Sequence, residues 1–233
     1  MQIPSLLRWN VSPEEAAQIQ RELAQRVCET NVLETVRRVA GVDVGLEGPD
    51  KETARAAIVV LQLPELVPIE YAIARVPVTF PYIPGLLAFR EIPAILHALE
   101  KIRIEPDVLI VDGHGRAHPR RLGIASHLGV LIERVTIGCA KSILCGHAAE
   151  PPQRVGAWTP LLDGDECVGA AVRTRASASP VYVSVGHRIT LSRAIELVLQ
   201  CCKGYRLPET TRYAHRVAGG HPIPLGAVQT SWL

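Results

Sequence analysis

The chain has 233 residues, 48% of them hydrophobic, with 25 lysines and arginines against 23 aspartates and glutamates. That length allows one large domain whose core needs no disulfide or metal for support. A net charge of +2 is too small to identify a nucleic-acid-binding protein by charge alone. We expect a single domain over residues 1–233, ending in a loosely ordered tail over 220–233 that is rich in Gly and Pro.

The sequence also bears on compartment and association. No apolar run approaches the roughly 20 residues that span a bilayer, and the N-terminus lacks the pattern of a secretion signal. The six cysteines form no CxxC pair, which favours reduced thiols. We therefore expect a cytoplasmic protein with no membrane association, and no pattern in the sequence indicates anything other than a monomer.

The first part of the chain predicts a helix followed by three strands. Ser12 precedes Pro13, Glu14 and Glu15, which is typical of a helix start because a hydroxyl cap is followed by proline and acids in the first turn. This helix should run to about Val27. Three β-rich stretches follow, separated by breaks short enough for antiparallel hairpins: 39–44, 54–62 and 67–78.

The rest of the chain alternates helices with short apolar strands. Segment 86–102 has apolar residues at helical spacing, with Pro93 expected to kink the helix or end its first turn. Segment 107–113, DVLIVDG, is typical of a strand buried on both faces, which we expect to pair parallel with the first strand. Further helices are predicted at 122–133, 190–202 and 208–218, and further strands at 135–140, 168–174 and 181–185. The order predicts a mixed α/β fold with a central sheet flanked by helices.

Two aspartates follow or end apolar strands that carry no other charge. Asp43 lies in VAGVDVG and Asp112 in VLIVDGHG. If these strands are neighbours, their carboxylates converge beyond the strand ends, where open α/β sheets bind ligands. Each aspartate alone is better explained as the start of a turn, whereas the pair favours Mg²⁺, which binds one or two carboxylates together with substrate phosphate.

Three other residues are candidates for the same site. Glu91, on the predicted helix after the Pro-rich loop, can supply a third carboxylate or be an ordinary surface residue. His215, on the last helix, can complete the site or shuttle a proton, but a lone helical histidine is more often structural. Lys141, at a strand end, can stabilise developing negative charge or simply be solvated.

Two loops carry candidate nucleic-acid contacts. In PYIP, residues 81–84, two prolines stiffen a partly aromatic tip that can wedge between bases or pack against the core. His114 and His118 have the spacing of a zinc pair, but they lie in a Gly-containing loop without a third soft ligand, so structural zinc is rejected. Donation to a phosphate is the better functional interpretation of His118. Basic residues gather at 116–121 and 203–216, where they can line a groove or be ordinary solvated surface.

Several segments taken together resemble the successive motifs of the endonuclease V family, in the family's order and over roughly residues 10–218. These segments are GVDVG, FPYIPGLLAFRE, VDGHGRAHPRRLGIASHLGV, GCAKS and ETTRYAH. The second and third are long and unusual enough to make the resemblance highly specific. The sequence departs from the family's pattern at Gly45, Ile143, Val185 and Thr210, of which Ile143 removes a basic residue from a phosphate-contacting position.

The resemblance implies a ribonuclease H-like fold and Mg²⁺-dependent hydrolysis of the second phosphodiester bond 3′ to deoxyinosine in damaged DNA, leaving 3′-hydroxyl and 5′-phosphate ends. Mn²⁺ is expected to substitute for Mg²⁺. The implied metal ligands are Asp43, Asp112 and Glu91, and the implied catalytic set adds Lys141 and His215.

The resemblance also implies a set of residues that bind the DNA and the lesion. PYIP would part the strands, glycines would allow close approach of the rotated-out base, and two side chains would contact phosphates. The set is Pro81, Tyr82, Ile83, Pro84, Gly85, Leu87, Arg90, Gly113, Gly115 and His118, the phosphate contacts being Arg90 and His118. Two alternatives remain at this point: an endonuclease acting on inosine in RNA, and a module that binds damage without cutting.

Overall fold

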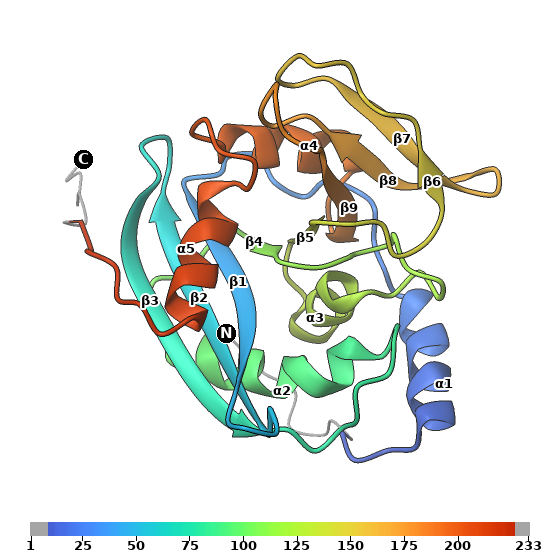
Figure 1. Cartoon of the computed structure of the whole chain (residues 1–233), viewed down its shortest axis with the longest axis vertical. Coiled ribbons are helices and arrows are strands. Elements are labelled where there is room, and N and C mark those ends of the chain that lie inside the picture. The colour runs from blue at the N-terminus through green and yellow to red at the C-terminus, as the bar shows by residue number, and fades with distance from the viewer. Residues whose placement is uncertain (1–8, 227–233) are drawn as a thin grey trace.

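The computed structural model describes residues 9–226 as a central sheet covered on both faces by helices (Figure 1). The helices are α1 (Pro13–Ala24), α2 (Leu87–Leu99), α3 (Ile124–Ile132), α4 (Leu191–Gln200) and α5 (Glu209–Ala218). The strands are β1 (Arg38–Glu47), β2 (Thr53–Gln62), β3 (Val67–Pro77), β4 (Val108–Val111), β5 (Thr136–Ala140), β6 (His147–Ala148), β7 (Trp158–Asp163), β8 (Glu166–Val172) and β9 (Val181–His187).

The sheet is mixed, with strand order β3-β2-β1-β4-β5-β9-β8-β7-β6. Strands β1, β2 and β3 form the expected antiparallel meander. Strand β4 pairs parallel with β1 and with β5, which confirms the predicted parallel pairing of the buried strand. The remaining strands are antiparallel and extend the sheet into the β6–β8 region at the upper right of Figure 1.

Alternation along the strands gives the sheet two apolar faces. Val39, Val59 and Ile110 lie in one core with residues of α4 and α5. Their neighbours in sequence point to the other face, where a second core includes residues of α2 and α3. Because both faces are covered, the inner strands are nearly continuous apolar runs.

Helix α5 lies directly on β1 with almost no side chain between the two backbones. A Cβ atom at Gly41 would sit 1.9 Å from the carbonyl oxygen of Thr210. Any residue larger than glycine would therefore push the helix away from the strand. This close approach sets how near the last helix comes to the polar end of β1.

Two local predictions need correction. Helix α1 begins at the expected Ser12 cap, which forms a capping box with Glu15, but ends at Ala24 rather than near Val27. Helix α2 continues through Pro93 to Leu99, so the expectation that this proline ends the first turn is wrong. Burial of the α2 face against the sheet outweighs the roughly 3 kcal/mol that an interior proline costs.

Strands β6 and β7 were not predicted from the sequence. The first has two residues, and the second contains Pro160 and has mostly partly exposed or exposed side chains. Neither has the apolar alternation or the apolar run that indicates a strand. Strand β7 pairs with β8, which the sequence does indicate, and β6 pairs with β7.

The last described segment, 220–226, has no helix or strand. Ile223 is nevertheless buried, and the Gly226 amide donates to the Pro68 carbonyl at 2.8 Å. The rest of the predicted tail, 227–233, lies outside the described residues. Within 9–226, no helix is both long and apolar enough to cross a membrane.

Candidate active site

The register of β1 and β4 brings the two predicted aspartates together. Val42 pairs with Val111, so Asp43 and Asp112 follow at the same level and on the same face. The Asp112 amide also donates to the Val42 carbonyl at 2.9 Å. The backbone pairing of two parallel strands therefore fixes the spacing of the two carboxylates.

Helix α5 adds a histidine to this pair. His215 Nδ1 lies 2.8 Å from Asp43 Oδ2. One ligand atom from each of Asp43, Asp112 and His215 falls within 4.8 Å of the others, so the three can hold one metal ion. Both aspartate side chains are about one-tenth exposed, at 12% and 10%, whereas His215 is 67% exposed. The cluster is thus closed on the sheet side and open to a substrate on the helix side.

Glu91, from α2, lies outside the three-residue group of Asp43, Asp112 and His215 but close enough for the charges of both aspartates to act on it. Burial, followed by the nearby charges of Asp43 and Asp112, raises the pKa of Glu91 to about 8. Burial and Asp43 also raise the pKa of Asp112. Three carboxylates brought near one another in this way form an oxygen-rich set suited to a divalent cation.

Lys141 stands at the end of β5 beside this set. Its Nζ lies 2.5 Å from Asp112 Oδ2, and its side chain is 41% exposed. The Lys141 carbonyl accepts a hydrogen bond from Arg206 Nη2 at 2.6 Å. Arg206 also donates to the carbonyls of Ser179 and Pro180, so it ties the loop after β5 to the segment before β9. The only sequence signal at Arg206 is its place among basic residues.

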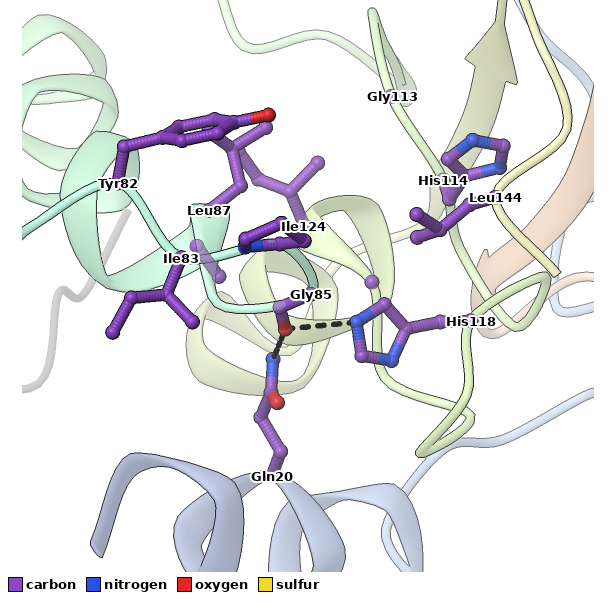
Figure 2. A pocket seen from close by; sticks show the side chains of 13 residues that line it. Gln20, Tyr82, Ile83, Gly85, Leu87, Gly113, His114, His118, Ile124 and Leu144 are labelled. Carbon is purple, nitrogen blue, oxygen red and sulfur yellow. Dashed lines mark hydrogen bonds between the residues drawn. The ribbon is translucent and has the colours of Figure 1, made fainter. Parts of the chain in front are cut away.

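A largely apolar cavity of about 150 Å³ begins next to Asp112 (Figure 2). Gly113, the residue after Asp112, lines it, so the acidic cluster and the cavity share one loop. The predicted set contributes seven lining residues: Tyr82, Ile83, Pro84, Gly85, Leu87, Gly113 and His118. The lining residues outside that set are Gln20, Ala88, His114, Gly123, Ile124 and Leu144.

The PYIP loop forms one wall of the cavity and also reaches solvent. Tyr82 is 71% exposed, far more than most aromatic side chains of a folded core. The loop ends at Gly85, whose φ of +80° is a left-handed conformation that glycine adopts readily. This turn leads the chain from the exposed tip into α2.

His118 lies inside the protein rather than at its surface. It is 2% exposed, its Nε2 lies 2.9 Å from the Gly85 carbonyl oxygen, and its Nδ1 accepts from the Arg120 amide. Burial is the main cause that lowers the pKa of His118 to about 4. Both ring nitrogens therefore have partners within the protein, and the phosphate contact of His118 stays a prediction.

Three other predicted contacts lie outside the cavity lining. Arg90 donates to the backbone carbonyls of Phe80 and Lys51, at 3.4 and 3.3 Å. The Gly115 amide donates to Ser184 Oγ at 2.8 Å. Pro81 is exposed at the start of the PYIP loop. These three surround the site without contributing to the cavity wall.

Gln20 and His114 line the cavity and were missed as functional residues. Gln20 lies four residues after Ala16, which is the other buried residue of α1. An amide on the buried face of an amphipathic helix is a signal that sequence analysis could have used. Burial lowers the pKa of His114 to about 4, so its imidazole is neutral beside the cavity.

The site combines aspartates from neighbouring parallel strands of a mixed sheet with a carboxylate from a flanking helix and a lysine at the next strand end. This arrangement defines a nuclease-type site on a ribonuclease H-like fold. The family model of Endonuclease V matches residues 21–216, and the chain belongs to the Endonuclease V family. The expected fold and family are thereby confirmed.

Individual relatives agree with this membership. Endonuclease V of Roseiflexus sp. (strain RS-1) is 53% identical over 216 residues, covering 93% of this chain and 96% of that protein. The crystal structure of Endonuclease V from Streptomyces avermitilis matches with a TM-score of 0.87 and 43% identity, covering 94% and 95% of the two chains. Endonuclease V from Ciona intestinalis, in complex with a 23mer DNA containing an inosine followed by a ribo-adenosine, matches with a TM-score of 0.78 and 28% identity, covering 90% and 98%.

Proposed function

We propose that this protein recognises deoxyinosine in damaged DNA and hydrolyses the second phosphodiester bond on its 3′ side, leaving 3′-hydroxyl and 5′-phosphate ends, with Mg²⁺ as cofactor. The observation that carries the proposal is the junction of two regions. An apolar cavity suited to a rotated-out base meets an acidic cluster at the successive residues Asp112 and Gly113. The inosine-containing DNA bound by the Ciona intestinalis relative supports the choice of lesion.

The donor set fits a hard divalent cation. Asp43, Asp112 and Glu91 would hold it, since carboxylate oxygens are preferred by Mg²⁺, and Mn²⁺ can use the same ligands. When bound, the cation supplies charge stabilisation and activation of water for phosphodiester hydrolysis. The raised pKa values of Glu91 and Asp112 support this fit, because a cation would remove the mutual repulsion that contributes to them.

The protein's own groups divide the remaining work. Lys141 Nζ, beside Asp112, can neutralise negative charge on the phosphate. His215, whose Nδ1 is held by Asp43, can orient the attacking water through Nε2. Tyr82 can stack against the bases that remain when the lesion leaves the helix, while Leu87 and Gly113 receive it in the cavity.

RNA containing inosine is the second candidate substrate. The Ciona intestinalis complex has a ribo-adenosine after the inosine, so that relative accommodates a ribose at this position. A module that binds damage without cutting is disfavoured, because the acidic cluster and its lysine are complete.

The test is cleavage of an end-labelled duplex that contains one deoxyinosine, beside an undamaged duplex and a matched RNA strand with one inosine. We expect a nick at the second phosphodiester bond 3′ to the lesion with Mg²⁺, none with EDTA, and none with the Asp43→Ala protein. Cleavage of the RNA alone would replace the DNA proposal. Binding without metal-dependent cleavage of either substrate would contradict both nuclease candidates.

A further inference from the structure

Gln20 is a buried amide on a helix that is otherwise largely exposed. It is 1% exposed, and its side chain reaches from α1 to the cavity wall (Figure 2). An apolar residue at this position would bury its side chain without needing hydrogen-bond partners. The buried amide therefore has to be explained by its contacts.

Those contacts join three segments that are distant in sequence. Gln20 Nε2 donates to the Gly85 carbonyl at 3.1 Å and to the Leu122 carbonyl at 3.3 Å. Gln20 Oε1 accepts from Arg120 Nε at 2.6 Å. The amide uses both its donors and its acceptor, so its orientation is fixed by three partners.

The Gly85 carbonyl is the point where this network converges. Besides Gln20, it faces His118 Nε2 at 2.9 Å and Arg120 Nη2 at 2.8 Å. Three donors thus surround a single oxygen that has two lone pairs. Figure 2 shows Gln20 and His118 bonded to this oxygen on the side away from Tyr82.

Gly85 is the residue at which the PYIP loop turns into the cavity wall. Its left-handed backbone would be flexible in isolation, since glycine has many accessible conformations. Hydrogen bonds from three side chains hold it in one of them. The cavity can then exist before a base enters, which avoids the free energy of ordering the loop during binding.

We propose that Gln20 is a positioning residue for base recognition, acting with Arg120 to fix Gly85 and so preform the cavity. This inference rests on the proposed function, because it concerns the step in which the rotated-out base enters. Gln20 touches neither the acidic cluster nor Lys141 in the structure. Its loss should therefore weaken capture of the lesion without slowing hydrolysis of a captured substrate.

The experiment compares three variants with the wild type. Gln20→Leu removes the amide, and Gln20→Glu keeps the length and the acceptor for Arg120 but removes both donors. Gln18→Leu is the matched control on the same helix, because Gln18 bonds Glu22 and Arg21 at the surface. Single-turnover cleavage of the deoxyinosine duplex is followed against protein concentration, and metal-free binding is measured for that duplex and for an undamaged one. Thermal unfolding checks that each variant is folded.

For both Gln20 variants we expect the half-saturating protein concentration to rise about 10-fold, which corresponds to the loss of a buried hydrogen-bond partner. The cleavage rate at saturation should stay within about twofold, because the reacting groups are untouched. Affinity for the undamaged duplex and all properties of Gln18→Leu should match the wild type. If Gln20→Leu does not fold, Arg120→Lys replaces it, since a lysine lacks the planar fork by which Arg120 bonds Gln20 through Nε and Gly85 through Nη2.

Equal losses of affinity for damaged and undamaged duplexes would overturn the inference, as would a slower saturated rate with unchanged half-saturation. Wild-type behaviour of folded Gln20 variants would overturn it as well. These outcomes are distinct from failure of the proposed function, in which the wild type itself would not cut the deoxyinosine duplex.

Discussion

The acidic cluster and the cavity are adjacent, but they are held in opposite ways. Burial, followed by the charges of the neighbouring carboxylates, raises the pKa values of Glu91 and Asp112, so Asp43, Asp112 and Glu91 lie together at a cost in free energy. The cavity wall at Gly85 is held by hydrogen bonds that satisfy its polar groups. One region stores unfavourable charge that a cation can relieve, and the other is stable without a ligand.

The two regions nevertheless share their supports. Leu87 and Glu91 lie four residues apart on the same face of α2, one lining the cavity and the other reaching the cluster. At the end of β4, Asp112 likewise belongs to the cluster while the next residue, Gly113, lines the cavity. Mutations can therefore separate chemistry from recognition only when they change a side chain and leave these shared backbones in place.

The largest expected effect comes from breaking the cluster alone. Asp112→Asn should lower the saturated cleavage rate by at least about 100-fold, since even the outer partners of metal ligands are worth ~10–100-fold. Affinity for the deoxyinosine duplex without metal should be retained, because the neighbouring Gly113 is unchanged. Single-turnover kinetics and metal-free anisotropy give the two numbers. Loss of lesion binding in a folded variant would show that the two regions are not separable.

A smaller effect is expected from loosening Lys141 without removing it. Arg206→Ala deletes the hydrogen bond to the Lys141 carbonyl, so we expect the saturated rate to fall roughly 10-fold, because small misplacements of reacting groups can cost up to ~100-fold. Half-saturation should change little. The control is Arg188→Ala. Arg188 follows β9 and its guanidinium bonds Glu133, near the start of β5 and so at the opposite end of that strand from Lys141. Equal rate losses in both variants would point to general destabilisation.

For the PYIP loop we expect the reverse: weaker binding of the lesion with an unchanged cleavage rate. Tyr82→Ala should weaken capture of the lesion by about 5- to 150-fold, the range that follows from ~1–3 kcal/mol for stacking of one base on an aromatic ring. The saturated rate should remain close to that of the wild type. Tyr82→Phe, which keeps the ring, serves as the control and should behave as the wild type in the same titration. A slower saturated rate in Tyr82→Ala would assign the tyrosine to the chemistry instead.

The smallest effect on cleavage is expected from the core beneath both regions, which acts on stability instead. His127 packs against Phe89 of α2 and Trp9, and burial lowers its pKa to about 3. The unfolded chain takes up a proton near pH 6.5 while the folded protein does not, so stability falls as pH drops from about 6.5 towards 3. The loss per pH unit is at most about 1.4 kcal/mol for this one group.

His127→Leu removes that contribution, so its free energy of unfolding should depend less steeply on pH over this interval than that of the wild type. Urea unfolding at several pH values measures the two slopes. His97→Leu, a change of an exposed histidine on α2, is the control. Parallel curves for the wild type and His127→Leu would exclude His127 as a source of acid sensitivity.

The sequence predicts the cluster better than the network behind the cavity, for a physical reason. Asp43 and Asp112 follow apolar strands whose parallel pairing can be inferred from their composition, and pairing alone brings them together. Helix α2 and the PYIP loop were likewise indicated by local patterns. The contacts of Gln20 span 65 and 102 residues, and no local pattern encodes which loop a buried amide will meet.

His118 illustrates the same limit from the other direction. With structural zinc rejected, a phosphate contact was the functional interpretation of His118, and the fold turns its ring inward to Gly85. The role of a histidine depends on which way its loop faces, and this is decided by tertiary packing. The phosphate-contact hypothesis for Arg90 remains a prediction. The guanidinium of Arg90 lies beside the PYIP loop, where it donates to the Phe80 carbonyl.

The contact of α5 with Gly41 bears on when the protein becomes active during synthesis. His215 comes 172 residues after Asp43, and the helix that carries it must seat on a strand made much earlier. A nascent chain can form the β1–β3 meander, the PYIP loop and the paired aspartates while α5 is still inside the ribosome. His215 is made after the other residues of the cluster, so the complete cluster forms only after α5 has emerged from the ribosome.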